Sequence, residues 1–184
     1  MITEPDHLII FFMPGLGGHH LANLFALTGR YRYRVDYSKY FTGQEHAHFF
    51  DKTDQSQTIS LYHFGNANDD LIDQVRNSKV NFVVIHWPTH NELAWRRLEK
   101  LNGPLRTPRM CDCVYDLTKL YKQKFLEKIY PGNWNTVMAD DLFSPNADTL
   151  VKQIESIAGP IQQHQSLVHD IHAAWINNII KQVA

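Results

Sequence analysis

The segment Pro14-Gly-Leu-Gly-Gly-His-His20 contains the residue types best suited to binding chemistry in this sequence. It follows the apolar run Leu8–Met13, and its glycines allow successive backbone N–H groups to converge on one point. A helix that begins there adds the positive end of its dipole. We therefore predict a site for an anion of phosphate or sulfate size, although the segment also fits a tight turn without a ligand. The candidate binding residues are Gly15, Leu16, Gly17, Gly18, His19 and His20.

Two further histidines stand at the ends of apolar segments, where they are expected to face the same crevice. A neutral imidazole can take a proton from a hydroxyl group, which makes His63 a candidate general base. His86, when protonated, could bind a phosphate, although it supplies less charge at pH 7 than an arginine would. Both residues are also compatible with half-buried histidines whose ring nitrogens bond to the backbone.

The 11 histidines form no recognisable metal motif. No pair in the spacing His-x₃-His is flanked by a glutamate as in zinc proteases, so we predict no metal site. Three histidines of the last helical segment are expected at the surface or in an interface, and Trp175 of the same segment is expected in the core. These three histidines are His164, His169 and His172.

Charged side chains near the expected crevice have two possible roles. The arginines could line the crevice or form a solvated face, and the two acidic residues that follow the last strand could cap a helix or form salt bridges. The residues concerned are Arg96, Arg97, Arg106, Arg109, Asp140 and Asp141.

Short apolar segments alternate with segments of helical spacing along the chain. This pattern predicts an α/β fold with three layers and a mostly parallel sheet flanked by helices, in which ligands bind at the carboxyl ends of the strands. Strands are expected at residues 8–13, 58–64, 80–85 and 134–139, and helices at 19–27, 69–76, 90–101, 113–129, 145–158 and 161–183. The aromatic and histidine-rich segment 30–56 shows no period and is expected to pack irregularly on the core.

Local signals predict where some helices begin and end. Thr89 and Glu92 have the spacing of a capping box. Ser144 and Pro145 fit the N-cap and first positions of a later helix, and Gly159 fits its end.

Length and composition limit the class of protein. The chain of 184 residues fits one domain, residues 1–184, and its 43% hydrophobic residues with 20% charged residues are typical of globular proteins. A formal net charge of -1 disfavours nucleic-acid binding. No apolar run approaches the roughly 20 residues of a membrane span, and Glu4 and Asp6 stand where a secretory signal has basic residues. We therefore expect no membrane partner.

Several segments, in this order, resemble those of sulfotransferase-like P-loop proteins, in particular small ones of marine bacteriophages. The family's first strand ends in P-K-[ST]-G-G-T-x-L, and a later strand carries the histidine that serves as base in many members, here His63. A strand of the family that ends in R-[DN]-P resembles residues 83–88, and its Y-E-D-L-x-x-x-P stretch resembles residues 137–145. The matched residues are Pro14, Gly17, Gly18, Leu21, His63, Pro88, Asp141 and Leu142.

The chain departs from the family at the residues that bind the sulfuryl donor. Gly15 stands where the family has its loop lysine, and His86 stands where an arginine binds the 3′-phosphate. Ala94 stands where a serine does the same, and the family's late basic loop has no counterpart. Because sulfuryl transfer depends on positioned positive charge, these departures put the usual donor chemistry in doubt.

Two functions remain open at this point. The resemblance implies a sulfotransferase-like protein that binds 3′-phosphoadenosine 5′-phosphosulfate after the first strand and transfers a sulfuryl group to a hydroxyl, with His63 as base. The departures favour a catalytically inactive protein of the same fold that serves as a structural or binding subunit of a phage particle or tail. The expected partners are a small-molecule anion or nucleotide, or other virion proteins or further copies of the chain. The expected location is the host cytoplasm or the virion.

Overall fold

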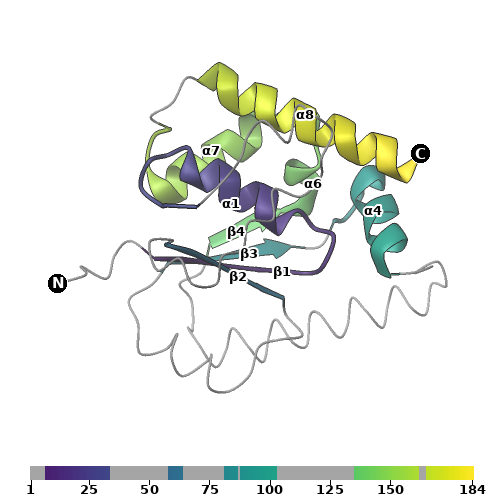
Figure 1. Ribbon diagram of the computed structural model, residues 1–184, viewed down its shortest axis with the longest axis horizontal. Coiled ribbons are helices and arrows are strands. Elements are labelled where there is room, and N and C mark those ends of the chain that lie inside the picture. The colour runs from purple at the N-terminus through teal and green to yellow at the C-terminus, as the bar shows by residue number, and fades with distance from the viewer. Residues whose placement is uncertain (1–6, 34–57, 64–80, 87, 103–134, 162–164) are drawn as a thin grey trace.

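The computed structural model describes residues 7–33, 58–63, 81–86, 88–102, 135–161 and 165–184. Within these ranges the chain forms one four-stranded parallel sheet with the strand order β2-β1-β3-β4 (Figure 1). The strands are β1 (Leu8–Phe12), β2 (Ile59–His63), β3 (Asn81–His86) and β4 (Asn135–Met138). The predicted α/β fold with a parallel sheet flanked by helices is thus confirmed.

The position of β1 between β2 and β3 creates a topological switch point. The chain pairs β2 on one side of β1 and then crosses to pair β3 on the other side. The register aligns Phe12 with His63 in β2 and Phe11 with Val84 in β3. Ligands of open parallel sheets bind beyond the carboxyl ends of the strands at such a point. The turns that follow β1 and β3 therefore lie where ligands bind in folds of this kind.

The continuous apolar sequence of β1 reflects burial on both of its faces. All five of its residues are buried, as expected for a central parallel strand. Leu8, Ile10 and Phe12 belong to the main hydrophobic core, together with side chains of the described helices.

Most of the described helices form a layer over one face of this sheet (Figure 1). Helix α1 (Gly18–Ala26) contacts β1 and β2, α6 (Ala139–Leu142) and α7 (Asp148–Ala158) contact β4, and α8 (Gln165–Val183) crosses over them on the outside. Helix α4 (Glu92–Asn102) packs against α8. Among the helices in the described ranges, none combines the length and apolar character that a membrane span needs.

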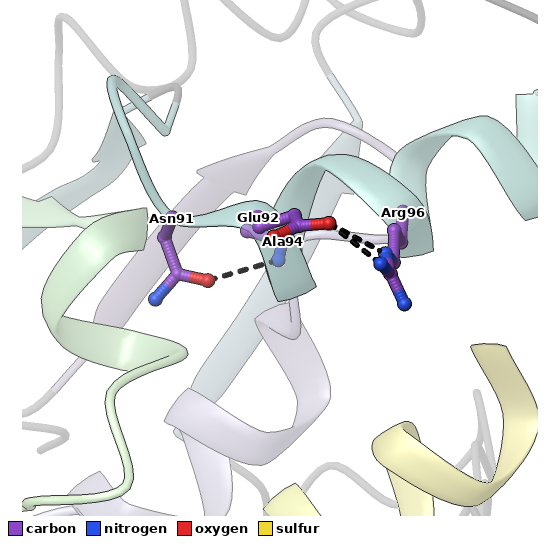
Figure 2. Close-up of polar contacts among 4 residues, drawn as sticks. All are labelled: Asn91, Glu92, Ala94 and Arg96. Carbon is purple, nitrogen blue, oxygen red and sulfur yellow. Dashed lines mark hydrogen bonds and ion pairs between the residues drawn. The ribbon is translucent and has the colours of Figure 1, made fainter. Parts of the chain in front are cut away.

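Helix α4 begins differently from the prediction. Its N-cap is Asn91, whose Oδ1 accepts a hydrogen bond from the Ala94 backbone N–H at 3.1 Å (Figure 2). The Glu92 carboxylate binds the Arg96 guanidinium one turn later (Figure 2). The predicted capping box of Thr89 and Glu92 is therefore wrong, because the Thr89 hydroxyl donates to the Asp140 carboxylate instead.

Helix α7 also begins later than predicted. It starts at Asp148, so Pro145 is not its first residue. Ser144 Oγ accepts from the Asn146 N–H at 3.2 Å and Asn146 Oδ1 accepts from the Asp148 N–H at 2.9 Å, which holds residues 144–148 in two successive local turns. The end of this helix at Gly159 is confirmed, with a φ of 90°.

Other predictions fall outside the described residues. These are the helices at 69–76 and 113–129, most of the segment 30–56, Arg106, Arg109 and His164. Within residues 30–33, Tyr31 is buried in the core, and its hydroxyl accepts a hydrogen bond from Asn81 Nδ2 at 3.0 Å.

Candidate anion-binding edge of the sheet

The turn between β1 and α1 begins with a hydrogen-bonded reversal of four residues. The Leu16 N–H donates to the Met13 carbonyl at 3.0 Å, so Pro14 and Gly15 are the central residues. The proline ring fixes φ at the first central position, and Gly15 adopts a φ of 99° at the second. Proline followed by a residue of positive φ defines a type II turn. The local sequence therefore explains why the chain reverses here.

The other two glycines of this turn allow close approaches by side chains of the protein itself. A Cβ atom on Gly17 would lie 2.8 Å from Cζ2 of Trp175, and one on Gly18 would lie 2.5 Å from Cδ1 of Phe12. On Gly15, the nearest atom would be Cδ1 of Leu101 at 3.2 Å. These faces of the turn are thus covered by the chain, and the glycines have a packing reason that needs no ligand.

The N-terminus of α1 receives no negative charge from its own sequence. Its N-cap Gly17 has a left-handed conformation with a φ of 73°, and no side chain caps the helix. The first turn of α1 also contains no acidic residue. Because the first N–H groups of a helix lack partners within the helix, this end carries the partial positive charge of the helix dipole.

The predicted histidines His63 and His86 lie at the same edge of the sheet as this turn. His63 is the last residue of β2 and pairs with Phe12, directly beside the end of β1. His86 is the last residue of β3, is half-buried, and pairs with Met138 of β4. The fold therefore brings three segments that are distant in sequence to one edge; the His63 side chain itself lies outside the description.

The two histidines in the first turn of α1, His19 and His20, lie in different surroundings. His19 is half-buried, and its Nδ1 lies 2.6 Å from the Tyr33 hydroxyl. Burial raises the pKa of Tyr33, so this hydroxyl keeps its proton. His20 is only 2% exposed and contacts His172 and Trp175 of α8. It therefore lies in the interface of α1 with α8, and Leu16 is fully buried as well.

His172 agrees with only one of its two predicted places, whereas Trp175 agrees with its prediction. His172 was expected at the surface or in an interface; it is completely buried and contacts His20 of α1, so the surface alternative is wrong. Trp175 is a core residue as expected.

The neighbouring turn after β3 contains a hydrogen-bonded arrangement that the sequence did not reveal. The Asp140 carboxylate accepts hydrogen bonds from the N–H groups of Thr89, His90 and Asn91 at 2.8, 3.1 and 2.8 Å. It also accepts from the Thr89 hydroxyl at 2.6 Å. Asp140 thus serves as the anion of the turn before α4. None of these N–H groups lies inside α4, so Asp140 holds the turn before the helix, while Asn91 is the helix cap.

These contacts change the acidity of Asp140. Partial burial raises the pKa of its carboxyl group. The hydrogen bonds from Thr89, His90 and Asn91 lower the pKa by more, so that it lies below its ordinary value.

The cations of α4 are directed away from the turn after β1. Arg96 forms an exposed ion pair with Glu92, and Arg97 is buried and donates to the Gln182 side chain of α8. Lys100 donates to the Gln182 carbonyl. No cluster of three or more histidine, cysteine or acidic side chains that could hold a metal exists within the described part of the chain.

Comparisons of the chain with protein-family models, with curated proteins and with solved structures give no match. The class of the protein is therefore defined by its own architecture. It is an α/β protein with a parallel sheet, in which a glycine turn and an uncapped helix N-terminus lie at the switch point.

Proposed function

We propose that this chain is a sulfotransferase-like P-loop protein that binds a phosphate- or sulfate-bearing nucleotide in the turn 14–20. The observation that carries the proposal is the contrast between two helix N-termini at one sheet edge. The chain supplies its own carboxylate, Asp140, to the start of α4 but supplies no acid and no side-chain cap to the start of α1. An external anion would accept hydrogen bonds from N–H groups at the start of α1, as Asp140 does in the turn before α4.

The ligand class follows from the resemblance and from the residues at this edge. 3′-Phosphoadenosine 5′-phosphosulfate would place its 5′ end at the turn, within reach of the backbone N–H groups of residues 17–19. His86 at the end of β3 would contact the 3′-phosphate in place of the family's arginine. The pairing of Phe12 with His63 supports the placement of His63 beside the same ligand.

The corresponding reaction is sulfuryl transfer to a hydroxyl group. His63 would take the hydroxyl proton while the acceptor oxygen forms a bond to sulfur. The bond between sulfur and the bridging phosphate oxygen would break, and 3′-phosphoadenosine 5′-phosphate would leave. Because no lysine stands at Gly15, we expect slow transfer, with rates reduced on the order of 10²–10³ by comparison with loss of one oxyanion donor.

Binding is tested by calorimetric titration of the whole chain with 3′-phosphoadenosine 5′-phosphate. We expect a saturable heat that becomes at least about tenfold weaker in His86→Gln, a loss of about 1.4 kcal/mol. The matched control is His169→Gln, which changes a histidine of α8 that pairs with Asp148 away from this edge. No heat and no thermal stabilisation at millimolar nucleotide would contradict the proposal.

A second function is favoured by the packing of the turn. Side chains of the protein itself cover Gly15, Gly17 and Gly18, and the basic side chains of α4 bond to Glu92 and Gln182. This arrangement suits a protein that keeps the fold without the donor site and acts as a subunit of a phage particle or tail. Sedimentation at high concentration tests it, since a strict monomer that associates with no virion component would not fit such a role.

A further inference from the structure

Two buried histidines connect the first and last described helices. His20 Nε2 of α1 lies 3.0 Å from His172 Nδ1 of α8, and His172 Nε2 lies 2.7 Å from the Ser144 carbonyl oxygen. The two residues are 2% and 0% exposed. The His20 ring stacks on Trp175 with a centroid distance of 4.1 Å and an interplanar angle of 6°. The pair therefore lies in a nearly water-free part of the α1–α8 interface.

The acceptor at the end of this chain of contacts fixes the position of each proton. A carbonyl oxygen can only accept, so His172 Nε2 must carry a hydrogen and donate it to Ser144. In the neutral ring His172 Nδ1 is then an acceptor, and His20 Nε2 must donate to it. As long as His20 keeps this tautomer, a proton added to His172 Nδ1 would place two N–H donors opposite each other at 3.0 Å. A proton added to His20 would create a buried cation.

The surroundings of the pair favour the neutral form. Burial lowers the pKa of His20, and the neighbouring His172 lowers it further. Burial also lowers the pKa of His172, the hydrogen bond to Ser144 opposes this shift, and His169 adds to it. His169 itself lies near the Asp148 carboxylate of α7 at 3.6 Å.

Several charged groups of the neighbouring elements have other partners. Asp140 of α6 binds the turn before α4, and Asp141 accepts from Gln153 of α7. Arg97 and Lys100 of α4 bond to Gln182 near the other end of α8. The contacts of Arg97 and Lys100 hold the C-terminal end of α8 independently of the histidines.

We propose that His20 and His172 form an acid-sensitive latch, and that proton uptake by the pair in mildly acidic solution releases α8 from α1. The released segment carries Trp175, the side chain that covers Gly17 in the turn after β1. Acid would therefore uncover that turn, whether or not a nucleotide binds there. The latch does not depend on the proposed function.

The sign of the effect follows from proton linkage. When α8 is docked, both histidines resist protonation; when it is released, they titrate near the ordinary value of 6.5. Above this pH neither state binds the extra protons, so the latch has its full strength. Below it the released state binds more protons, and each histidine favours release by about tenfold per pH unit until the docked state also titrates.

Hydrogen–deuterium exchange of the whole chain at pH 7.5 and pH 5.5 tests the latch, with rates corrected for the intrinsic effect of pH. We expect protection of the α8 segment around residues 168–176 to fall by more than about tenfold, mostly through His20, whose pKa lies well below 6.5 when α8 is docked, and less through His172. Protection in β1 and β3 should fall less than about threefold. Unchanged protection of α8, or an equal fall in α8 and β1, would overturn the proposal.

His20→Gln separates the latch from a general acid effect. The side-chain amide of the introduced glutamine could still donate to His172 Nδ1, but it does not titrate, so the loss of protection should shrink to less than about tenfold. His90→Gln is the matched control because it removes an exposed histidine of the turn before α4, and it should behave as the unaltered chain does. An equal pH response in both variants would overturn the proposal. If the first variant fails to fold, the comparison of α8 with β1 in the unaltered chain decides.

Discussion

The turns after β1 and β3 occupy equivalent places in the fold, but different side chains bond to them. Both leave neighbouring parallel strands at the carboxyl edge and lead to the N-terminus of a helix. The turn before α4 receives the Asp140 carboxylate and the Asn91 side chain. The turn before α1 receives neither a side-chain cap nor an acid.

This difference shows that the two turns are held by different kinds of contact. The turn before α4 is held by polar contacts, since a carboxylate from the β4–α6 junction bonds three N–H groups and a hydroxyl. The turn before α1 is held by packing, because Trp175 and Phe12 fit against Gly17 and Gly18. The helix N-terminus that is held by packing receives no carboxylate from the chain, whereas the turn before α4 receives Asp140.

The largest effect should come from filling the space that the packed turn requires. Gly17→Ala forces a left-handed residue to carry a Cβ atom that would lie 2.8 Å from Trp175. Backbone strain and overpacking together should lower the free energy of unfolding by about 3 kcal/mol. Urea denaturation monitored by circular dichroism measures this change.

Gly159→Ala is the matched control for this substitution. Gly159 also has a positive φ, of 90°, but no atom lies within 4 Å of a Cβ built on it. Only backbone strain remains, so we expect a loss of about 1–2 kcal/mol. Equal losses in the two variants would show that Trp175 does not hold the turn.

The second effect concerns the turn that is held by polar contacts. Asp140→Ala removes the acceptor for three N–H groups and the Thr89 hydroxyl, and should lower the free energy of unfolding by about 1.5 kcal/mol, as loss of a helix cap does. Sulfate should bind the vacated N–H groups and restore part of this loss, measured by urea denaturation relative to the unaltered chain in the same salt.

Asp141→Ala is the matched control, because it removes one carboxylate from the neighbouring position of the same helix. Asp141 lies next to Asp140 on α6 and accepts one hydrogen bond, from Gln153 Nε2 at 2.8 Å. Its removal should cost less than about 1 kcal/mol and show no specific response to sulfate. If sulfate stabilised both variants equally, Asp140 would not be the anion that neutralises the start of α4.

The fold could be predicted where the determining signal was local. The apolar run at residues 8–13 predicted β1 because burial on both faces leaves no polar position in the strand. Pro14 and Gly15 predicted a turn because their φ angles are those that a type II turn needs. The four residues of α6 could not be predicted, since one helical turn is too short to show a hydrophobic period.

The errors arose where a side chain found a distant partner. Thr89 had the spacing of a helix cap, but Asp140, 51 residues away, binds its hydroxyl. His172 had a position in the last helix that also fitted the surface, but it is buried against His20, 152 residues earlier. Such pairings depend on how strands and helices are stacked, and no local pattern in one sequence specifies that stacking.

The smallest effect concerns the acid that α4 has in its first turn and α1 lacks. Glu92→Gln removes a favourable charge at the start of α4 and the exposed pair with Arg96 at 2.6 Å, which solvent weakens. We expect a loss of about 0.5 kcal/mol, reduced further in roughly 0.5 M salt because exposed charges are screened. Glu99→Gln, on the same helix but outside its first turn, should change the free energy of unfolding less. If both variants lose equally, the first-turn acid contributes nothing, and the contrast between the two helix starts rests on Asp140 and Asn91 alone.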